Sequence, residues 1–240
     1  AKGGHDVILV ARNREKLEEA AKYLAGMYGI RAEVVAADLK DPDAPQAILG
    51  QVDQFGLGVD VLVNNAGFGD WGLFGRADLQ RQLDMLQVNV VALTTLTRLV
   101  LPRMVSRRAG RILNVASTAA FAPGPLMAVY YASKAYVLSF SEALSNEFKG
   151  TGITVTALCP GPTRTAFAQE AGMTGSNLFA GPNVMDAAPV ATAGYQAMML
   201  GRAVVVPGLG NKLLIQSIRI SPRFLIRAIT RWFQEGRQGA

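Results

Sequence analysis

A tyrosine and a lysine stand four residues apart, at Tyr130 and Lys134, in a segment whose apolar pattern predicts a helix. Residues i and i+4 of a helix share a face, so the phenol and the ammonium group can lie close together. A free tyrosine has a pKa of about 10, and a neighbouring cation lowers that pKa towards the range useful for proton transfer. We therefore predict an acid–base pair, with a solvated surface pair as the alternative. Tyr131 has Ala135 at its own fourth position, so we expect it to pack instead.

Ser117 and Asn89 are two further candidate members of this site. Ser117 comes directly after a short apolar run and thirteen residues before Tyr130, although a serine there could also cap a helix or form a turn. Asn89 lies inside an apolar helical segment, where an asparagine is unfavourable unless its amide finds a partner. Both positions are therefore best explained by a polar site built around Tyr130.

The elements that must position these residues are short apolar runs that alternate with helical segments. The runs are rich in Val and Ile and show little polar alternation, which is typical of strands buried on both faces of a parallel sheet. They cover Val7–Ala11, Ala32–Ala36, 59–63, 111–116, Ile153–Leu158 and 203–206. This alternation predicts an α/β fold, a doubly wound parallel sheet in a single domain.

Apolar residues recur with a helical period between the runs. Asn13 is expected to cap the first helix, and Gly26 is expected to end it. The segment 78–104 is long enough for two helices in series, and a further helix is expected over 126–148. In such folds ligands bind beyond the carboxyl ends of the strands. Residues that directly follow the runs are therefore the ones expected to meet at one site.

Four short motifs stand at these strand ends or shortly after them, in a fixed order. They are Asn64-Asn65-Ala66-Gly67, Asn114-Val115-Ala116-Ser117, Tyr130-Tyr131-Ala132-Ser133-Lys134 and Pro160-Gly161-Pro162-Thr163. In order and spacing the chain resembles the short-chain dehydrogenase/reductase family over essentially its whole length. The resemblance implies a Rossmann-like fold and an enzyme that moves a hydride between a nicotinamide cofactor and a carbonyl or alcohol.

The resemblance also implies a role for each catalytic residue. Tyr130 would protonate the carbonyl oxygen during reduction, and Ser117 would hydrogen-bond the same oxygen. Lys134 would hold the nicotinamide ribose, together with Tyr130. Asn89 would help to hold a water molecule in a proton relay.

Further residues are implied to bind the cofactor. Asp38 would accept a hydrogen bond from the adenine amino group, although it could instead cap the helix that follows. Small residues permit close approach of a ligand to the backbone, and a plain turn is the alternative for Pro160-Gly161. The backbone positions implied to lie against the adenosine ribose are Asn65, Ala66 and Gly67, and those implied to lie near the nicotinamide carboxamide are Pro160, Gly161 and Thr163.

Arg12 determines which cofactor is predicted. An acidic residue at the end of the first visible strand would bind a ribose 2′-hydroxyl and indicate NAD. The chain has Ala11 there, followed by Arg12, whose guanidinium offers two parallel donors to a 2′-phosphate. The sequence therefore predicts NADP(H) in preference to NAD(H), with a solvated helix start as the alternative.

The glycine-rich phosphate loop of the resembled family has no counterpart in the sequence. That loop normally follows a first strand and seats the pyrophosphate on a helix N-terminus. The chain begins at Ala1 in what looks like the end of the next helix. We therefore expect the sequence to be a fragment without the first, central strand and the glycine-rich loop, and catalysis to belong to the intact protein.

Apolar residues crowd the loops beside the predicted reacting groups. They favour an apolar ketone or acyl compound as substrate, although packing beneath the loops would also explain them. The alternative function is a non-catalytic, dinucleotide-binding regulator on the same fold, and the intact Ser117, Tyr130 and Lys134 argue against it. The apolar residues are Phe68, Trp71, Phe74, Phe121, Pro123, Pro125, Leu126, Met127, Phe167, Met173, Leu178, Phe179 and Met185.

Composition excludes several other classes of protein. Half of the 240 residues are hydrophobic, which excludes global disorder. The one cysteine, Cys159, allows no intrachain disulfide, and no residues have metal-ligand spacing. We see no apolar run as long as a membrane-spanning helix and no signal peptide at the polar start. A cytoplasmic protein is therefore expected.

The C-terminal segment carries most of the net charge of +6. Residues 209–240 hold five of the six excess positive charges, so a uniformly basic nucleic-acid binder is not indicated. A helix from near Pro222 would align Arg223, Arg227 and Arg231 beside apolar residues and Trp232, as in a helix that lies in a membrane interface.

We interpret 1–208 as the dinucleotide-binding catalytic domain and 209–240 as its basic amphipathic helical extension. The sequence leaves two functions open for this extension. It could make a peripheral membrane contact, or its apolar face could cover the substrate pocket or a subunit interface. The family resemblance further implies a homodimer or homotetramer.

Overall fold

The computed structural model describes residues 1–173, 175–179 and 184–235. The chain forms two compact units, Ala1–Gly58 and Val59–Ala240, and each is described by itself. In both units parallel strands alternate with helices, which confirms the predicted α/β class.

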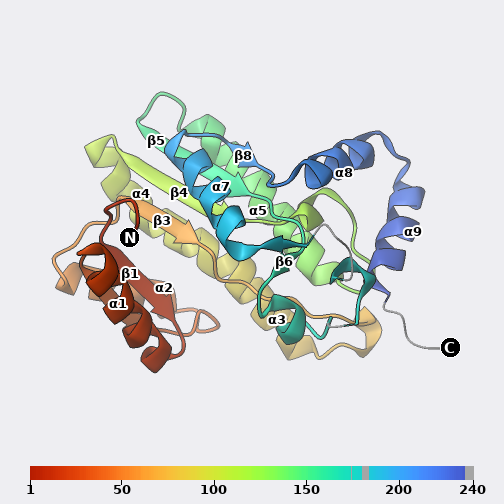
Figure 1. Ribbon diagram of the computed structural model, residues 1–240, viewed down its shortest axis with the longest axis horizontal. Coiled ribbons are helices and arrows are strands. Elements are labelled where there is room, and N and C mark those ends of the chain that lie inside the picture. Colours follow the sequence, from red (N-terminus) through yellow and green to blue (C-terminus); the bar gives the residue numbers. More distant parts are fainter. Residues whose placement is uncertain (174, 180–183, 236–240) are drawn as a thin grey trace. The chain divides into compact units, whose positions relative to one another are not determined.

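The first unit is a β–α–β–α segment. Strands β1 (Val7–Ala11) and β2 (Ala32–Ala36) pair in parallel and match the predicted ranges. Helices α1 (Arg14–Tyr28) and α2 (Ala44–Gln54) follow them (Figure 1). The predicted cap is confirmed, because the Asn13 side chain accepts a hydrogen bond from the Lys16 amide at 2.9 Å.

The predicted end of α1 at Gly26 is wrong, because the helix continues to Tyr28. Gly29 ends it instead, in a left-handed conformation with φ of 65°, and its amide donates to the Ala25 carbonyl at 2.9 Å. A glycine is favoured at such a left-handed cap position, whereas inside a helix it carries only a modest penalty. Gly26 and Gly29 both lie near the end of the apolar helical pattern, and only the backbone conformation shows which of them ends the helix.

The second unit is built on a four-stranded parallel sheet in the order β3-β4-β5-β8. Its strands are β3 (Val61–Asn64), β4 (Gly110–Val115), β5 (Ile153–Leu158) and β8 (Val204–Val205). All four were predicted, with ends displaced by up to two residues. Ala157 packs in a core cluster with residues of α4 and α5, whereas its neighbour Leu158 packs in a cluster with residues of α7. The sheet is therefore covered on both faces, as Figure 1 also shows.

The helices on these faces are α4 (Leu93–Arg107) and α5 (Ala128–Glu147) on one side and α7 (Ala187–Met199) on the other. The 126–148 prediction thus agrees with α5 to within two residues. The segment 78–104 is one continuous helix rather than two separate helices. It comprises α3 (Leu79–Leu86), a π-helical segment η2 (Gln87–Ala92) and α4.

This continuous helix, Leu79–Arg107, is long and apolar enough to cross a membrane by length and composition, with a mean hydropathy of 1.4 in its most apolar window. The expectation that no segment reaches that threshold is therefore wrong. Core helices pass the same test, and here Met85, Ala92, Val100 and Met104 are almost fully buried within the protein. Because 44% of that window is buried while Leu83 and Val91 are exposed, we interpret the stretch as a helix that packs one face into the core.

The remaining elements surround the carboxyl ends of the strands. The 3-10 helices are η1 (Phe74–Arg76), η3 (Thr118–Phe121) and η4 (Asn177–Phe179). The strands β6 (Thr163–Arg164) and β7 (Met185–Asp186) pair with each other, and the short helix α6 (Phe167–Glu170) lies between them. Helices α8 (Leu209–Ile220) and α9 (Arg223–Gln234) complete the described chain, and α9 begins where the sequence predicted.

Candidate active site

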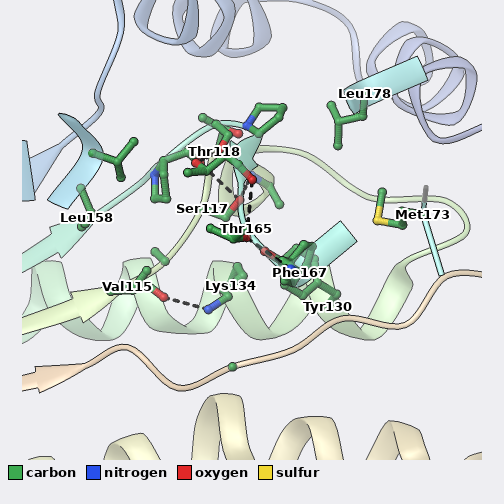
Figure 2. A pocket seen from close by; sticks show the side chains of 18 of the residues that line it. Val115, Ser117, Thr118, Tyr130, Lys134, Leu158, Thr165, Phe167, Met173 and Leu178 are labelled. Atoms are coloured by element: carbon green, nitrogen blue, oxygen red, sulfur yellow. Dashed lines mark hydrogen bonds between the residues drawn. The ribbon is translucent and has the colours of Figure 1, made fainter. Parts of the chain in front are cut away.

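A cavity of about 470 Å³ lies at the carboxyl ends of the strands in the second unit (Figure 2). Many of the predicted site residues line it, which confirms that the strand-end motifs meet in space. They are Asn65, Gly67, Ser117, Tyr130, Lys134, Pro160, Gly161 and Thr163.

The other predicted residues lie elsewhere. Ala66 is not among the residues that line the cavity, although it stands between two that do. Arg12 and Asp38 are exposed residues of the first unit, so their roles stay predictions. The Asp38 carboxylate accepts from the Lys40 amide at 3.1 Å, and Asp43 rather than Asp38 occupies the cap position of α2.

Tyr130 lies on α5 in a buried, aromatic environment. The ring of Phe167 lies 5.2 Å from its ring, centroid to centroid, and that of Tyr131 lies 6.1 Å away. Burial raises the pKa of the Tyr130 hydroxyl well above its usual value, and a hydrogen bond with Ser117 opposes this shift only in part. The expectation that Lys134 lowers the pKa of Tyr130 is therefore wrong in this structure. Loss of hydration outweighs the cation, whose Nζ lies 5.9 Å from the centre of the phenol ring.

Lys134 is also buried, one helical turn after Tyr130. Its Nζ donates to the carbonyl oxygen of Val115, the last residue of β4, at 2.8 Å (Figure 2). Burial lowers the pKa of this ammonium to about 8, because the charged form loses hydration. An ammonium carries three N–H groups, so this single bond leaves it able to donate to a ligand as well.

Ser117 joins β4 to η3. Its Oγ accepts a hydrogen bond from the Ala119 amide at 3.1 Å, so the predicted cap or turn role is present. The same side chain lines the cavity and hydrogen-bonds with Tyr130. The two readings of Ser117 are therefore compatible, because the local cap fixes the hydroxyl beside the phenol.

Asn89 lies beneath the cavity, in the π-helical segment η2, and is almost fully buried. Its Oδ1 accepts from the Phe68 amide at 3.1 Å, while its Nδ2 donates to the Phe68 carbonyl at 3.0 Å and to the Ser133 hydroxyl at 3.1 Å. π-helical turns are frequent at functional sites. In this structure the Asn89 amide thus positions the loop that follows β3.

A side chain at Gly67 on that loop would crowd the side chains of Asn89 and Lys134. A Cβ atom there would lie 3.0 Å from Asn89 Oδ1 and 3.3 Å from Lys134 Nζ. Gly161 is similarly restricted, because a Cβ would overlap the Asn211 side chain, and Thr163 Oγ1 donates to the Gly161 carbonyl at 2.9 Å. Both glycines leave bare backbone at the cavity surface, where a flat ligand can approach closely.

Buried amides fix the strand ends that carry these motifs. Asn64 Nδ2 donates to Thr97 Oγ1 at 3.1 Å and to Asn114 Oδ1 at 2.8 Å. Asn114 Nδ2 in turn donates to Ser141 Oγ at 2.9 Å. The network joins β3 and β4 to α4 and α5, so Lys134 and Ser117 stand on elements held together by satisfied polar groups.

The apolar residues named from the sequence divide into two sets. One set lines the cavity and consists of Met127, Phe167, Met173, Leu178 and Phe179. The others do not line it. Phe68 and Trp71 pack behind the cavity wall, Phe121 and Met185 pack in other core clusters, and Phe74 is exposed. Packing beneath the loops, the alternative raised from the sequence, therefore accounts for Phe68, Trp71, Phe121 and Met185 but not for Phe74.

Sequence reasoning missed Gln234, which comes from the last residue of α9 and lines the cavity. Its Nε2 donates to the Tyr131 hydroxyl at 2.6 Å, and its carbonyl accepts from the Trp71 indole at 2.9 Å. Tyr131 was expected only to pack, but it packs and lines the cavity as well. The spacing of Gln234 on the inner face of an amphipathic helix was the one available signal. Among the described residues, no cluster of His, Cys, Asp and Glu side chains could hold a metal ion.

Comparison with known proteins agrees with this geometry. The short chain dehydrogenase family matches residues 1–174. A very-long-chain 3-oxoacyl-CoA reductase of Anas platyrhynchos is 38% identical over 165 residues, which are 67% of this chain and 52% of that protein. A 17-beta-hydroxysteroid dehydrogenase type 3 of Danio rerio is 37% identical over 171 residues, 69% of this chain and 55% of that protein.

A solved structure is also similar. It is a short-chain dehydrogenase from Sphingobium yanoikuyae in complex with NADPH, 31% identical, with a TM-score of 0.79 and a match that covers 91% of this chain and 85% of that one. The chain spans about half the length of the curated relatives that it matches. Its matched region contains the strand-end motifs that carry the cavity, and on this evidence the chain belongs to the short-chain dehydrogenase family.

Proposed function

We propose that the intact protein is an NADPH-dependent oxidoreductase that interconverts a ketone and an alcohol on a large apolar substrate. One observation carries the proposal. Ser117, Tyr130 and Lys134 converge on a single cavity, whose further lining residues include Met127, Phe167, Met173, Leu178 and Phe179.

The nicotinamide half of a dinucleotide fits the residues at the floor of this cavity. Gly67 and Gly161 present backbone without side chains, and the Lys134 ammonium can donate to ribose hydroxyls. Thr163 lines the same cavity and would hydrogen-bond the carboxamide of the nicotinamide. When bound, the reduced cofactor supplies the hydride that the protein's own side chains cannot provide.

Tyr130 supplies the proton. The phenol is protonated at neutral pH, as a general acid for reduction must be, although burial raises its pKa and so makes it a weaker proton donor than a free tyrosine. During reduction the carbonyl carbon gains the hydride while the carbonyl oxygen takes the Tyr130 proton and becomes a hydroxyl. Ser117 Oγ, held beside the phenol, would hydrogen-bond the same oxygen and fix its direction.

The substrate class is supported by the apolar lining and by the names of the relatives. One relative is a reductase of very-long-chain 3-oxoacyl-CoA and the other a dehydrogenase of hydroxysteroids. Both names describe a keto or hydroxyl group on a large apolar body. The preference for NADPH rests on Arg12 and is supported by the related structure that was solved with NADPH.

The test is a substrate series with the intact protein, in which NADPH consumption is followed. We would compare 3-oxoacyl thioesters of increasing chain length, keto steroids and small polar ketones. Each buried methylene is worth about 0.8 kcal/mol, so kcat/KM should rise about fourfold per added methylene until the cavity is filled. Equal kcat/KM across the series would refute an apolar substrate. Tight NADPH binding without turnover of any carbonyl would favour the regulator instead.

A further inference from the structure

Helices α8 and α9, which are blue in Figure 1, carry large apolar side chains that are exposed to solvent. Ile220 is 87% exposed, Leu209 78%, Leu213 72%, Phe224 67% and Trp232 60%. Single exposed apolar residues are ordinary on a protein surface, but five such residues within two consecutive helices are not. This apolar surface therefore calls for an explanation beyond the packing of the second unit.

The exposed residues form stripes distinct from the faces that pack. On α9, Ile226 and Gln234 are buried, and Gln234 lines the cavity. Leu225, Ile229 and Trp232 recur at helical spacing on another side of the helix and are exposed. The inner face of α9 thus covers part of the cavity wall, and the outer apolar stripe of Leu225, Ile229 and Trp232 is 41% to 60% exposed.

Basic side chains border the apolar surface. Arg223 and Arg227 are exposed on α9, as are Lys212 and Arg219 on α8. Arg231 is exposed as well, but it pairs with Glu235 at 2.7 Å. Glu235 is the one acidic residue after position 208 in the sequence, so the surface is uniformly cationic apart from that pair.

This combination matches an anionic bilayer better than a second protein chain. Exposed Ile, Leu, Phe and Trp side chains can enter the boundary between headgroups and acyl chains, while arginines contact lipid phosphates. A second copy of this chain docked by the same surface would bring like charges together. We propose that α8 and α9 form a docking surface, defined by residues 209–232, for a membrane that contains anionic lipids.

Docking would have a consequence for the site, and this step rests on the proposed function. Because α9 contributes Gln234 to the cavity wall, the helix that contacts the lipid also forms part of the substrate pocket. Large apolar ketones partition into bilayers. The surface would therefore hold the pocket beside the phase in which such a substrate is concentrated.

The experiment is vesicle flotation of the intact protein. One set of vesicles contains phosphatidylcholine alone, and the other contains phosphatidylserine as well. We expect binding to the second set only, and weaker binding at high salt. Paired substitution R223Q/R227Q leaves the Arg231–Glu235 pair intact and should lower partitioning about fivefold per charge. Paired substitution I220S/F224S should remove binding at either salt concentration.

The matched control changes the same types of residue outside the surface. Leu200 is 68% exposed, and Arg202 is exposed beside it after α7. The L200S/R202Q variant should float like the unmodified protein. The proposal would be overturned if R223Q/R227Q and I220S/F224S floated with the vesicles as much as the control variant and the unmodified protein do. A second result would also overturn it. If the unmodified protein bound neither kind of vesicle, and light scattering showed that I220S/F224S converts a dimer to a monomer, then the surface would be occupied by a second copy of the chain.

Discussion

The side-chain amide of Gln234 donates a hydrogen bond to the Tyr131 hydroxyl at 2.6 Å, which ties the last turn of α9 to the helix that carries Tyr130 and Lys134. The backbone at this end of α9 is also bonded, because Asn177 Nδ2 donates to the carbonyls of Trp232 and Glu235 at 3.2 and 2.8 Å. The C-terminal carbonyls of a helix have no partners within the helix. Here the loops around the cavity satisfy several of them.

The first prediction concerns the hydrogen bond between Gln234 and Tyr131. Gln234→Leu leaves the buried Tyr131 hydroxyl without its donor and should lower stability by roughly 1–3 kcal/mol. Tyr131→Phe removes the other partner of the same bond. In a double-mutant cycle followed by urea unfolding, the two changes should be less than additive, because each removes the same bond. Strictly additive effects would mean that the bond contributes nothing to stability.

The second prediction concerns Tyr130 as the proposed proton donor. Tyr130→Phe removes the hydroxyl and should lower kcat for ketone reduction by about 10²–10⁴-fold, while NADPH affinity stays within a few fold. Tyr136→Phe is the matched control, since Tyr136 lies on the same helix but is exposed and bonds to Thr94 at 2.9 Å. Kinetics and fluorescence titration of the two variants would separate chemistry from binding. A Tyr130→Phe enzyme with near-normal kcat would remove the phenol from the mechanism.

The third prediction concerns pH. Lys134 is a cation below its pKa, which burial lowers to about 8, and is neutral above it. The raised pKa of Tyr130 keeps the phenol protonated through the same range. The kcat/KM for reduction should therefore be flat below pH 8 and fall about tenfold per unit above it, as the charge on Lys134 is lost. A profile that stays flat to about pH 10 would show that the charge is not needed.

The fourth prediction concerns cofactor choice. Arg12→Ala should raise KM for NADPH more than KM for NADH, because only NADPH carries a phosphate for the guanidinium to bind. Lys22→Ala is the control, since Lys22 is an exposed cation further along α1. Steady-state kinetics with both cofactors would measure the ratio. Equal changes for both cofactors in Arg12→Ala would show that Arg12 does not recognise the phosphate.

The fifth prediction compares two glycines in the turn before β5. Gly150 and Gly152 both have positive φ, 79° and 86°, so alanine is strained at each. A Cβ at Gly152 would also overlap the carbonyl oxygen of Arg108, whereas a Cβ at Gly150 meets no atom within 4 Å. Gly152→Ala should therefore destabilise the protein more than Gly150→Ala, by about 1–3 kcal/mol in urea unfolding. Similar losses at both positions would contradict the overlap.

Much of the framework of the site could be predicted from the sequence, because strand ends and motif order are local properties. Asn65, Ser117 and Thr163 follow buried runs, and parallel strands bring such residues to one edge, while the helix that carries Tyr130 begins soon after one of these ends. The direction of the Tyr130 pKa shift could not be predicted in this way. It depends on how deeply the phenol is buried, and Phe167, thirty-seven residues away, contributes to that burial.

Contacts between residues far apart in the sequence account for the other features of the site that sequence reasoning did not predict. Gln234 and Tyr131 are 103 residues apart, so nothing local indicates their bond. The same applies to Asn89, whose partners Phe68 and Ser133 lie on different elements. Sequence reasoning could say that its amide needs a partner, but it could not say which one.

The π-helical segment between α3 and α4 also sets a limit on sequence change. A π turn holds one residue more than an α-helical turn, and each helical residue advances the chain by about 100°. Deleting one residue from Gln87–Ala92 would convert the π turn into an α-helical turn and would turn the Asn89 amide away from Phe68, although α3 and α4 would stay close to their present phase. Adding one residue would instead rotate α3 by about 100° against α4 and turn core residues such as Met85 and Val100 out of phase. The segment should therefore tolerate substitutions far better than any change in its length.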